Sequence, residues 1–168
     1  MTAAPAETRK LLVGVGQFAV ATEPGTLLIA GSLGSCLGIA VYDPLVRAGG
    51  VLHLMLPESS LAPARAATHP GTFVDTGVPA LFHALYALGA EKYRTHIYVV
   101  GAGQIIDDAG VFNIGRRNYD ALAALLQKHN LRIRGEHVGG GLSRSVALDV
   151  TTGQVRVRAA GEPGEITL

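Results

Sequence analysis

The chain has 168 residues, the length of one domain of ordinary size. Hydrophobic residues make up 48% of it and charged residues only 16%, which is too apolar for a disordered protein. Its 14 basic and 13 acidic residues leave a net charge of +1, and this balance argues against a dedicated nucleic-acid binder, which needs a basic face.

The chain carries neither a disulfide nor a recognisable membrane segment. Its one cysteine, Cys36, has no partner for an internal disulfide and is consistent with a reducing compartment. Residues 1–10 are polar, lack the apolar core of a secretory signal and are expected to form a flexible tail. The uncharged stretch 26–42 falls short of the about 20 apolar residues of a spanning helix, and glycines interrupt it. We therefore expect a cytoplasmic protein without direct membrane insertion.

The first part of the chain predicts strands separated by turns. Apolar runs indicate strands at 11–20, 27–30, 37–42 and 51–56, with a turn at 21–25 and a loop at 43–50. Residues 58–71 are rich in Ser, Pro and Ala, which is typical of a surface loop.

The second part adds two helices to further strands. Pro79 suits the first turn of a helix and Gly89 the position after its end, so a helix is predicted over 79–88. A polar loop at 107–117 precedes a second amphipathic helix at 118–129. Further strands are predicted at 97–100, 131–134, 146–150 and 154–158.

The order of these elements is not a regular alternation of strand and helix. It predicts an α+β (mixed α/β) fold, in which two main helices cover a largely antiparallel sheet system. We expect one domain over residues 1–168, with residues 159–168 as a C-terminal tail.

Cys36 and His53 form the one combination of side chains that suggests chemistry. If 37–42 and 49–54 pair as a hairpin, opposed residues sum to 91. Cys36 and His53 are then diagonal neighbours on one face, with Cα atoms about 7–8 Å apart. A loop one residue longer or shorter would place them on opposite faces.

A thiol beside an imidazole supplies a nucleophile and its base. Gly34 and Ser35 leave backbone N–H groups free to face a developing oxyanion. The alternative is that Cys36 is a small buried hydrophobe and His53 a hydrogen-bonded core histidine. The residues alone leave both interpretations open.

Several motifs together resemble the chemoreceptor glutamine deamidase family, CheD, over most of the chain, from about Leu12 to Arg158. Near the cysteine and histidine they are Leu33-Gly34-Ser35-Cys36, Tyr42-Asp43-Pro44, Gly49-Gly50, His53 and Met55-Leu56-Pro57. Further along they are Phe73-Val74-Asp75-Thr76, the run Asn113-Ile114-Gly115-Arg116-Arg117-Asn118, Gly139-Gly140, Arg144 and Thr152-Gly153.

The resemblance implies a reaction. Proteins of this family hydrolyse the side-chain amides of selected glutamines on methyl-accepting chemotaxis receptors, giving glutamate and ammonia. By resemblance, Cys36 is the nucleophile and His53 the general base, and no cofactor is needed. The implied partners are the cytoplasmic region of the receptors and, in some organisms, a CheC-type phosphatase.

The sequence departs from the family pattern at Ala30, where the family carries a catalytic Thr six residues before its Cys. Ser32, two residues on, is a candidate auxiliary residue, because it would share a strand face with position 30 and could orient His53. His137 stands where many members have an acidic residue, and 101–106 differs from the usual glycine-rich run. A competing interpretation is a catalytically weakened module that binds receptors or a CheC-type phosphatase.

Other classes of site are less well supported. A cysteine peptidase would need the same pair of residues, but no peptidase signature accompanies them. Gly101-Ala102-Gly103 follows a predicted strand, yet the third glycine of a dinucleotide loop is replaced by Ile106. The six histidines show no spacing typical of metal ligands, so no metal is predicted.

Overall fold

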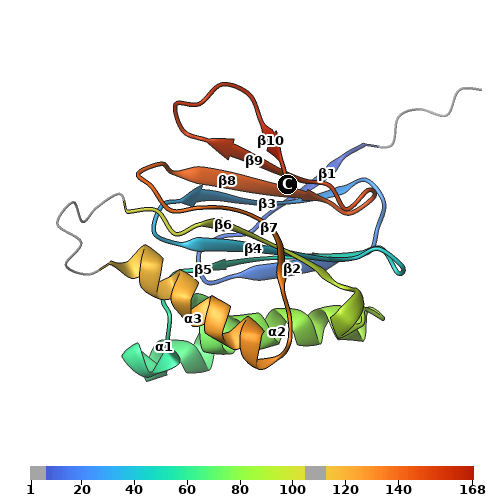
Figure 1. The fold of residues 1–168 in the computed structure, drawn as a ribbon. Helices are drawn as coiled ribbons and strands as arrows, with labels where there is room; N and C mark the ends of the chain where they lie inside the picture. Colours follow the sequence, from blue (N-terminus) through green and yellow to red (C-terminus); the bar gives the residue numbers. More distant parts are fainter. Residues whose placement is uncertain (1–6, 105–112) are drawn as a thin grey trace, which may run out of the picture.

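The computed structural model describes residues 7–104 and 113–168 as three layers, two stacked β-sheets and a layer of helices (Figure 1). The outer sheet has the strand order β1-β3-β8-β9-β10. Its strands are Arg9–Leu12, Thr26–Leu33, Arg144–Asp149, Val155–Ala159 and Ile166–Thr167. All of its neighbouring pairs are antiparallel except β1 and β3.

The middle sheet has the order β2-β5-β4-β6-β7. Its strands are Phe18–Ala21, Ala48–Leu54, Leu37–Asp43, His96–Gly101 and Ile133–Val138. Only the pair β6 and β7 is parallel. The α+β prediction with largely antiparallel sheets is therefore confirmed.

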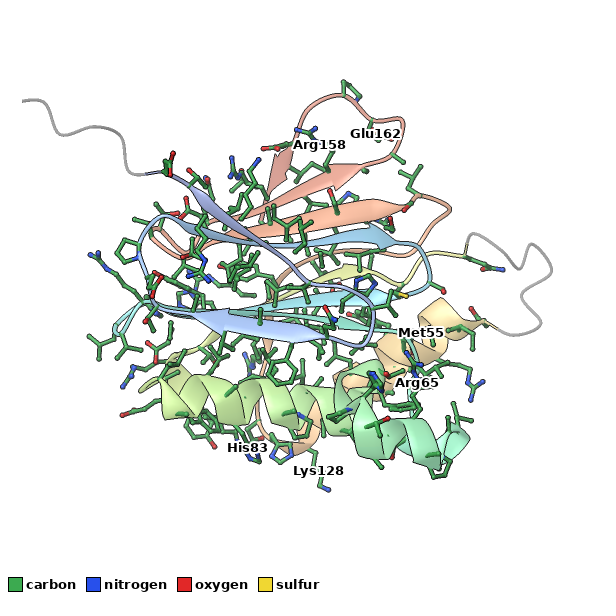
Figure 2. All side chains as sticks on the ribbon, turned by 180° about the vertical axis from the view of Figure 1, so that it is seen from behind. Met55, Arg65, His83, Lys128, Arg158 and Glu162 are labelled. Atoms are coloured by element: carbon green, nitrogen blue, oxygen red, sulfur yellow. The ribbon has the colours of Figure 1, made fainter. Side chains whose placement is uncertain are left out.

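Helices cover the face of the middle sheet that points away from the outer sheet. They are α1 (Pro63–Thr68), α2 (Val74–Ala87) and α3 (Ile114–Lys128), with 3₁₀ turns at Ser59–Leu61, Pro70–Thr72 and Lys92–Arg94. Figure 2 shows His83 and Lys128 on this helical side, and Arg158 and Glu162 at the opposite edge beside β9. No helix of the described residues is long and apolar enough to cross a membrane.

The strand alternation divides the apolar side chains between two cores. In β4, Leu37, Ile39 and Val41 pack toward the helices, whereas Ala40 and Tyr42 pack between the sheets. Successive side chains of a strand point to opposite faces, so the buried β4 contributes to both cores and reads as an unbroken apolar run. In β5 the same alternation turns Leu52 and Leu54 to the helices and Val51 to the outer sheet.

Several predicted boundaries were wrong. The run 11–20 is two strands in different sheets, β1 and β2, separated by a turn at 13–17. The expected loop at 58–71 contains α1 and two 3₁₀ turns, and α2 begins at Val74, so Pro79 lies inside it. Helix α3 begins at Ile114, four residues earlier than predicted, and the expected loop at 107–112 lies outside the described residues. The segment expected as a C-terminal tail includes β10.

Candidate active site

The β4–β5 hairpin places Cys36 and His53 as the sequence predicted. Leu37 pairs with Leu54 and Gly38 with His53, so opposed residues sum to 91. Cys36 directly precedes β4 and packs against the apolar cluster between the two sheets, which is the side to which His53 also points by strand alternation. The predicted register, and with it the shared face of the two residues, is confirmed.

The turn at 13–17 surrounds His53 with backbone groups. Gly16 N–H donates to the His53 carbonyl (2.8 Å), and His53 N–H donates to the Gln17 carbonyl (3.0 Å). The imidazole Nδ1 lies 3.3 Å from the Val13 carbonyl oxygen. Val13 is held in turn by its own N–H, which donates to Ile29 of β3 (2.7 Å). The histidine of the middle sheet is thus oriented by a main-chain atom beside the outer sheet.

This contact assigns the protons of the His53 imidazole. A carbonyl oxygen only accepts hydrogen bonds, so Nδ1 carries the proton and Nε2 of the neutral ring presents a lone pair. Nε2 is buried and has no hydrogen-bond partner among the described residues. Burial lowers the pKa of His53, against the opposing effect of the Val13 hydrogen bond. The ring is therefore neutral at pH 7 and its free nitrogen is a base.

Cys36 lies partly exposed in the bend between β3 and β4. Its carbonyl accepts from Ala102 N–H (2.9 Å), and the Gly34 carbonyl accepts from Gly103 N–H (2.8 Å). Burial raises the pKa of the Cys36 thiol, although its own backbone N–H lowers it. The resting pair is thus a neutral thiol and a neutral imidazole. Gly34 N–H donates to the Ser32 carbonyl (3.1 Å), so of the two donors expected for an oxyanion only the Ser35 N–H has no acceptor in the described part of the chain.

The end of β6 lies so close to the cysteine that only glycine fits there. Gly101 has a φ of 116°, and a Cβ on it would overlap the carbonyl oxygen of Cys36. A side chain at this position would displace the Cys36 backbone, and glycine adopts this positive φ without a Cβ clash. Gly101 therefore lets the end of β6 pack directly against the bend that contains Cys36.

The structure separates Ser32 from Ala30. Ala30 is fully buried between the sheets, whereas Ser32 is exposed, with a φ of 55°. The register of β3 against β8 shifts between Ala30 and Leu33, so the two-residue alternation that suggested a shared face is interrupted. The Ser32 hydroxyl does not hydrogen-bond to His53, whose Nε2 is unpartnered within the described part of the chain.

A buried arginine ties the C-terminal strands to this region. Arg144 donates from Nε to Nδ1 of His137 (2.7 Å) and from Nη2 to the Gly139 carbonyl (2.6 Å). Its Nη1 reaches the carbonyls of Gly101 (3.2 Å) and Leu142 (3.1 Å). Burial lowers the pKa of Arg144. His137, where many family members have an acidic residue, thus accepts a hydrogen bond from the Arg144 guanidinium. The same guanidinium donates to the carbonyl of Gly101, which lies beside Cys36.

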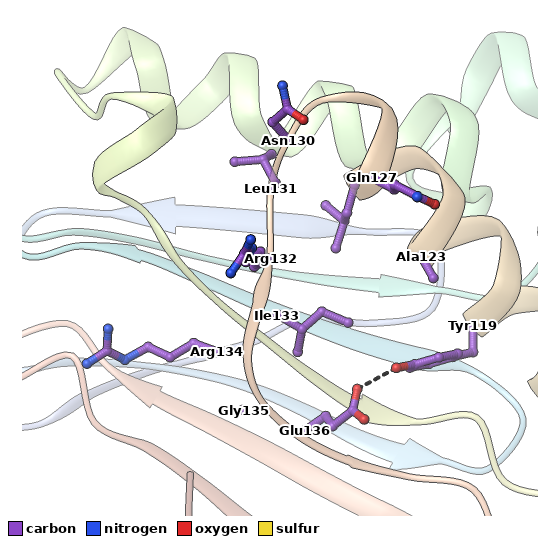
Figure 3. Close-up of a pocket in the computed structure, with 11 residues that line it drawn as sticks. Tyr119, Ala123, Gln127, Asn130, Leu131, Arg132, Ile133, Arg134, Gly135 and Glu136 are labelled. Atoms are coloured by element: carbon purple, nitrogen blue, oxygen red, sulfur yellow. Dashed lines mark hydrogen bonds between the residues drawn. The ribbon is translucent and has the colours of Figure 1, made fainter.

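A separate groove of about 810 Å³ lies between α3 and β7 and includes neither Cys36 nor His53 (Figure 3). Tyr119 donates to Glu136 across it (2.6 Å). That hydrogen bond, together with burial, raises the pKa of Tyr119 to about 12, so the phenol stays protonated. No nucleophile or base is prepared in this groove.

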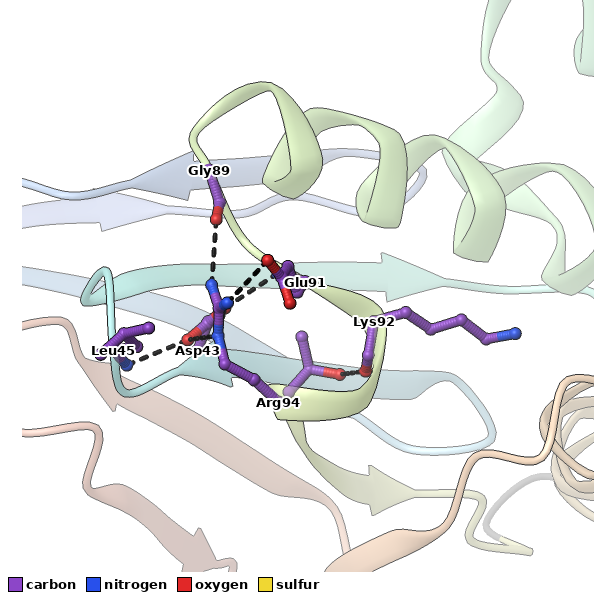
Figure 4. Close-up of polar contacts among 7 residues, drawn as sticks. Asp43, Leu45, Gly89, Glu91, Lys92 and Arg94 are labelled. Atoms are coloured by element: carbon purple, nitrogen blue, oxygen red, sulfur yellow. Dashed lines mark hydrogen bonds and ion pairs between the residues drawn. The ribbon is translucent and has the colours of Figure 1, made fainter.

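An ion pair fixes the far end of the β4–β5 hairpin (Figure 4). The buried Asp43 carboxylate accepts from the Leu45 and Glu91 backbone N–H groups (3.0 and 2.9 Å) and binds the Arg94 guanidinium (2.8 Å). Burial alone would raise the pKa of Asp43, but these hydrogen bonds outweigh it and lower the pKa. This ion pair therefore holds the turn end of the hairpin that sets the register of Cys36 and His53.

The roles of three residues near Cys36 and His53 could not be predicted from the sequence. Val13 acts through a main-chain oxygen, which has no sequence signature. Arg144 and Asn118 stood in the recognised motifs, but only the fold shows what they contact. Among the described residues no three His, Cys, Asp or Glu side chains are grouped in a way that could hold a metal ion.

Comparison with known proteins places the chain among relatives of one kind. Residues 55–159 match the model of the family described as CheD chemotactic sensory transduction. The matched range begins two residues after His53, so it includes Asn118 and Arg144 but neither member of the Cys–His pair.

Curated relatives extend the similarity over nearly the whole chain. The probable chemoreceptor glutamine deamidase CheD 1 of Syntrophus aciditrophicus is 42% identical over 153 residues, covering 91% of this chain and 96% of the relative. CheD 2 of Anaeromyxobacter dehalogenans is 42% identical, covering 89% and 94%. The protein of the same name from Pyrococcus abyssi is 37% identical, covering 90% and 92%. The chain belongs to the CheD family.

Proposed function

We propose that this chain is a protein-glutamine deamidase, a hydrolase of carbon–nitrogen bonds in linear amides. It converts selected glutamines of methyl-accepting chemotaxis receptors to glutamate and releases ammonia. The relatives are named for this activity. The observation that carries the proposal is the β4–β5 register, which sets Cys36 and His53 on one face with a free imidazole nitrogen.

The mechanism follows from the neutral resting pair. His53 Nε2 takes the proton of the Cys36 thiol as Sγ attacks the amide carbon of the glutamine side chain. The negative charge that develops on the amide oxygen is stabilised by the backbone N–H group of Ser35 at the bend. The imidazolium then protonates the leaving amine, ammonia departs, and a thioester to Cys36 remains.

Hydrolysis of the thioester completes the reaction. His53, neutral again, removes a proton from water as the water attacks the thioester carbon, and the thiolate leaves and regains its proton from the imidazolium. The Val13 carbonyl holds the ring in the required tautomer throughout. It supplies the orienting role that we considered for Ser32. Cys36 and His53 are thus the proposed catalytic residues.

The substrate determines the partner and the compartment. The partner is the cytoplasmic region of the receptors, so the protein acts in the cytoplasm. Cys36 is partly exposed and can meet a side chain presented by a protein surface, whereas His53 is only 2% exposed and is reached through the cysteine. A CheC-type phosphatase as a second partner is a further part of the proposal.

A second candidate function is a module that binds receptors or the phosphatase with little turnover. One observation favours it: buried Ala30 offers no hydroxyl beside the Cys–His pair, at the position where the resemblance implies a catalytic threonine.

The decisive experiment is incubation of the purified protein with a receptor cytoplasmic fragment, followed by peptide mass spectrometry for amide-to-acid conversion at glutamine. Conversion by the wild type and none by Cys36→Ala is expected, since that variant removes only the sulfur and keeps the fold. Ser32→Ala, which alters an exposed residue, is the matched control and keeps full activity. Equal conversion by Cys36→Ala would refute the thiol mechanism. Binding of the fragment without conversion by the wild type would favour the module.

A further inference from the structure

Asn118 is a buried polar residue of α3 that the proposed reaction does not use. It belongs to the run 113–118 that the sequence singled out, and it is fully buried. Its Nδ2 donates to the Ser35 carbonyl (3.0 Å) and to the Met55 carbonyl (3.0 Å). These two acceptors lie far from Asn118 in the sequence, and one precedes Cys36 while the other follows His53 by two residues.

We propose that Asn118 is a positioning residue that sets the separation of the Cys36 thiol and the His53 imidazole. The β4–β5 ladder ends with the pair Leu37 and Leu54, so Cys36 lies just outside it. Beyond this last strand pair, the Asn118 amide nitrogen links the two strand ends by donating to the carbonyls of Ser35 and Met55. These two hydrogen bonds replace the backbone hydrogen bonds that would join the strands here, next to Cys36 and His53. This inference rests on the proposed function.

The identity of the side chain follows from its task. Bridging two carbonyl oxygens from one short side chain needs two N–H donors on a single atom, and the carboxamide of asparagine provides them. Aspartate at neutral pH offers no donor, and leucine of similar size offers none. Asn118 Oδ1 is buried without a partner among the described residues. An unpaired buried oxygen opposes folding, so the residue is poorly explained by stability alone.

Helix α3 holds this amide in place. Gly115, in its first turn, lies so close to Ala102 and Gly103 that a Cβ would meet their backbone atoms. Leu122, one turn beyond Asn118, is fully buried in the core between helices and sheet. The same Gly103 donates to the Gly34 carbonyl. The helix, the end of β6 and the cysteine bend are therefore one packed unit.

The first test compares Asn118→Leu with Leu122→Ala, a control that removes core packing from the same helix without touching either carbonyl. Turnover is measured on a receptor fragment at saturating and limiting concentrations, and unfolding in urea shows the folded fraction. For Asn118→Leu we expect kcat to fall about 10- to 100-fold with little change in KM, because small misplacements of reacting groups carry such penalties. Leu122→Ala should lower the urea midpoint but keep kcat within about twofold.

A second measurement does not depend on a receptor. The rate of alkylation of Cys36 by iodoacetamide is followed against pH in the wild type, Asn118→Leu and His53→Ala. Loss of the bridge should move the profile of Asn118→Leu toward that of His53→Ala. The alkylation profiles remain informative even if the wild type fails to deamidate receptors, so failure of the proposed function and failure of this inference are distinguishable.

Three results would overturn the inference. One is an unchanged kcat for Asn118→Leu with an alkylation profile that superimposes on the wild type. Another is an equal loss of kcat in Leu122→Ala at the same folded fraction, which would assign the effect to general loosening of α3. The third is an identical profile for His53→Ala and the wild type, which would leave no Cys–His pairing for Asn118 to set.

Discussion

At the scale of single residues, the state of His53 decides how the site works. Many thiol enzymes rest as a thiolate beside an imidazolium, because a nearby positive charge lowers the pKa of the cysteine. Here burial shifts the pKa of the histidine down and that of the cysteine up. Both groups therefore rest uncharged, and in the mechanism that we propose the proton moves from the Cys36 sulfur to His53 Nε2 as the substrate is attacked.

The pH dependence of kcat/KM follows from these shifts. In the proposed mechanism activity needs neutral His53, so it should rise as the pH increases through the pKa of this residue, which lies below the ordinary value of about 6.5. A pH–rate profile on a receptor fragment should show an acid limb centred below that value. An acid limb centred above pH 7 would contradict a base whose pKa is lowered by burial.

Position 30 tests whether the hydroxyl typical of the family is required. Ala30→Thr places a hydroxyl among buried apolar groups, so the free energy of unfolding should fall by about 1–3 kcal/mol unless the hydroxyl finds a partner. Since the Val13 carbonyl already fixes the imidazole, kcat should change by less than about threefold. Urea unfolding and an ammonia-release assay measure the two effects. Turnover that appears only in Ala30→Thr would identify the wild type as the binding module.

The common face of Cys36 and His53 could be predicted from sequence for a given loop length, because strand alternation and loop length determine which residues share a face. What orients the histidine could not be predicted. The Val13 carbonyl is a main-chain atom, and any residue at position 13 would carry it. Ser32 was a reasonable candidate by spacing, but a bulge in β3 interrupts the alternation on which that spacing relied.

At the scale of elements, the β4–β5 hairpin is the part of the fold that the sequence predicted best. Its strands are short, apolar and bounded by turn residues, so their existence was accessible from sequence. Their register was stated only for one loop length, and the structure shows that this loop length is the one present. The neighbouring segment 58–71 was not, since its helical turns are short and none of α1 is buried. The start of α2 was misplaced because proline, common in first helical turns, here lies further in.

Removing the charge of Asp43 should weaken the hairpin at its closed end. Asp43→Asn removes the buried one of the two carboxylates that bind the Arg94 guanidinium, and we expect the free energy of unfolding to fall by about 1–3 kcal/mol at neutral pH. Urea denaturation measures the change. The matched control is Glu91→Gln, which alters the exposed carboxylate on the same arginine and should cost less than about 0.5 kcal/mol.

The pH dependence of this effect has a definite sign. The pKa of Asp43 is lower in the folded protein, so its stabilisation is fully present above the ordinary aspartate value of about 3.9 and is lost as the pH falls through the folded value. The difference in stability between wild type and Asp43→Asn should therefore shrink in acid. A difference that grows toward low pH would contradict this role.

At the scale of the whole molecule, the candidate site lies where all three layers meet. Val13 comes from beside the outer sheet, His53 from the middle sheet and Asn118 from the helical layer. Helices covering a sheet system could be predicted from the kinds of elements, but the division of the strands between two stacked sheets could not. Strands β1 and β2 were read as one, so the turn at 13–17 that crosses between the sheets and encloses His53 was hidden.

The dependence of the cysteine bend on Arg144 has a consequence for the protein during its synthesis. Cys36 and His53 are made early, yet the cluster behind them includes Val146, Leu148 and Val157, and Gly101 is fixed by the Arg144 guanidinium. A nascent chain that has not yet released β8 from the ribosome therefore lacks one wall of the site. Because contacts so distant in sequence form late in folding, the thiol acquires its surroundings only when translation is nearly complete. Chains truncated before β8 would contain Cys36 and His53 but lack the Arg144 contact and the packing of β8 and β9 behind them.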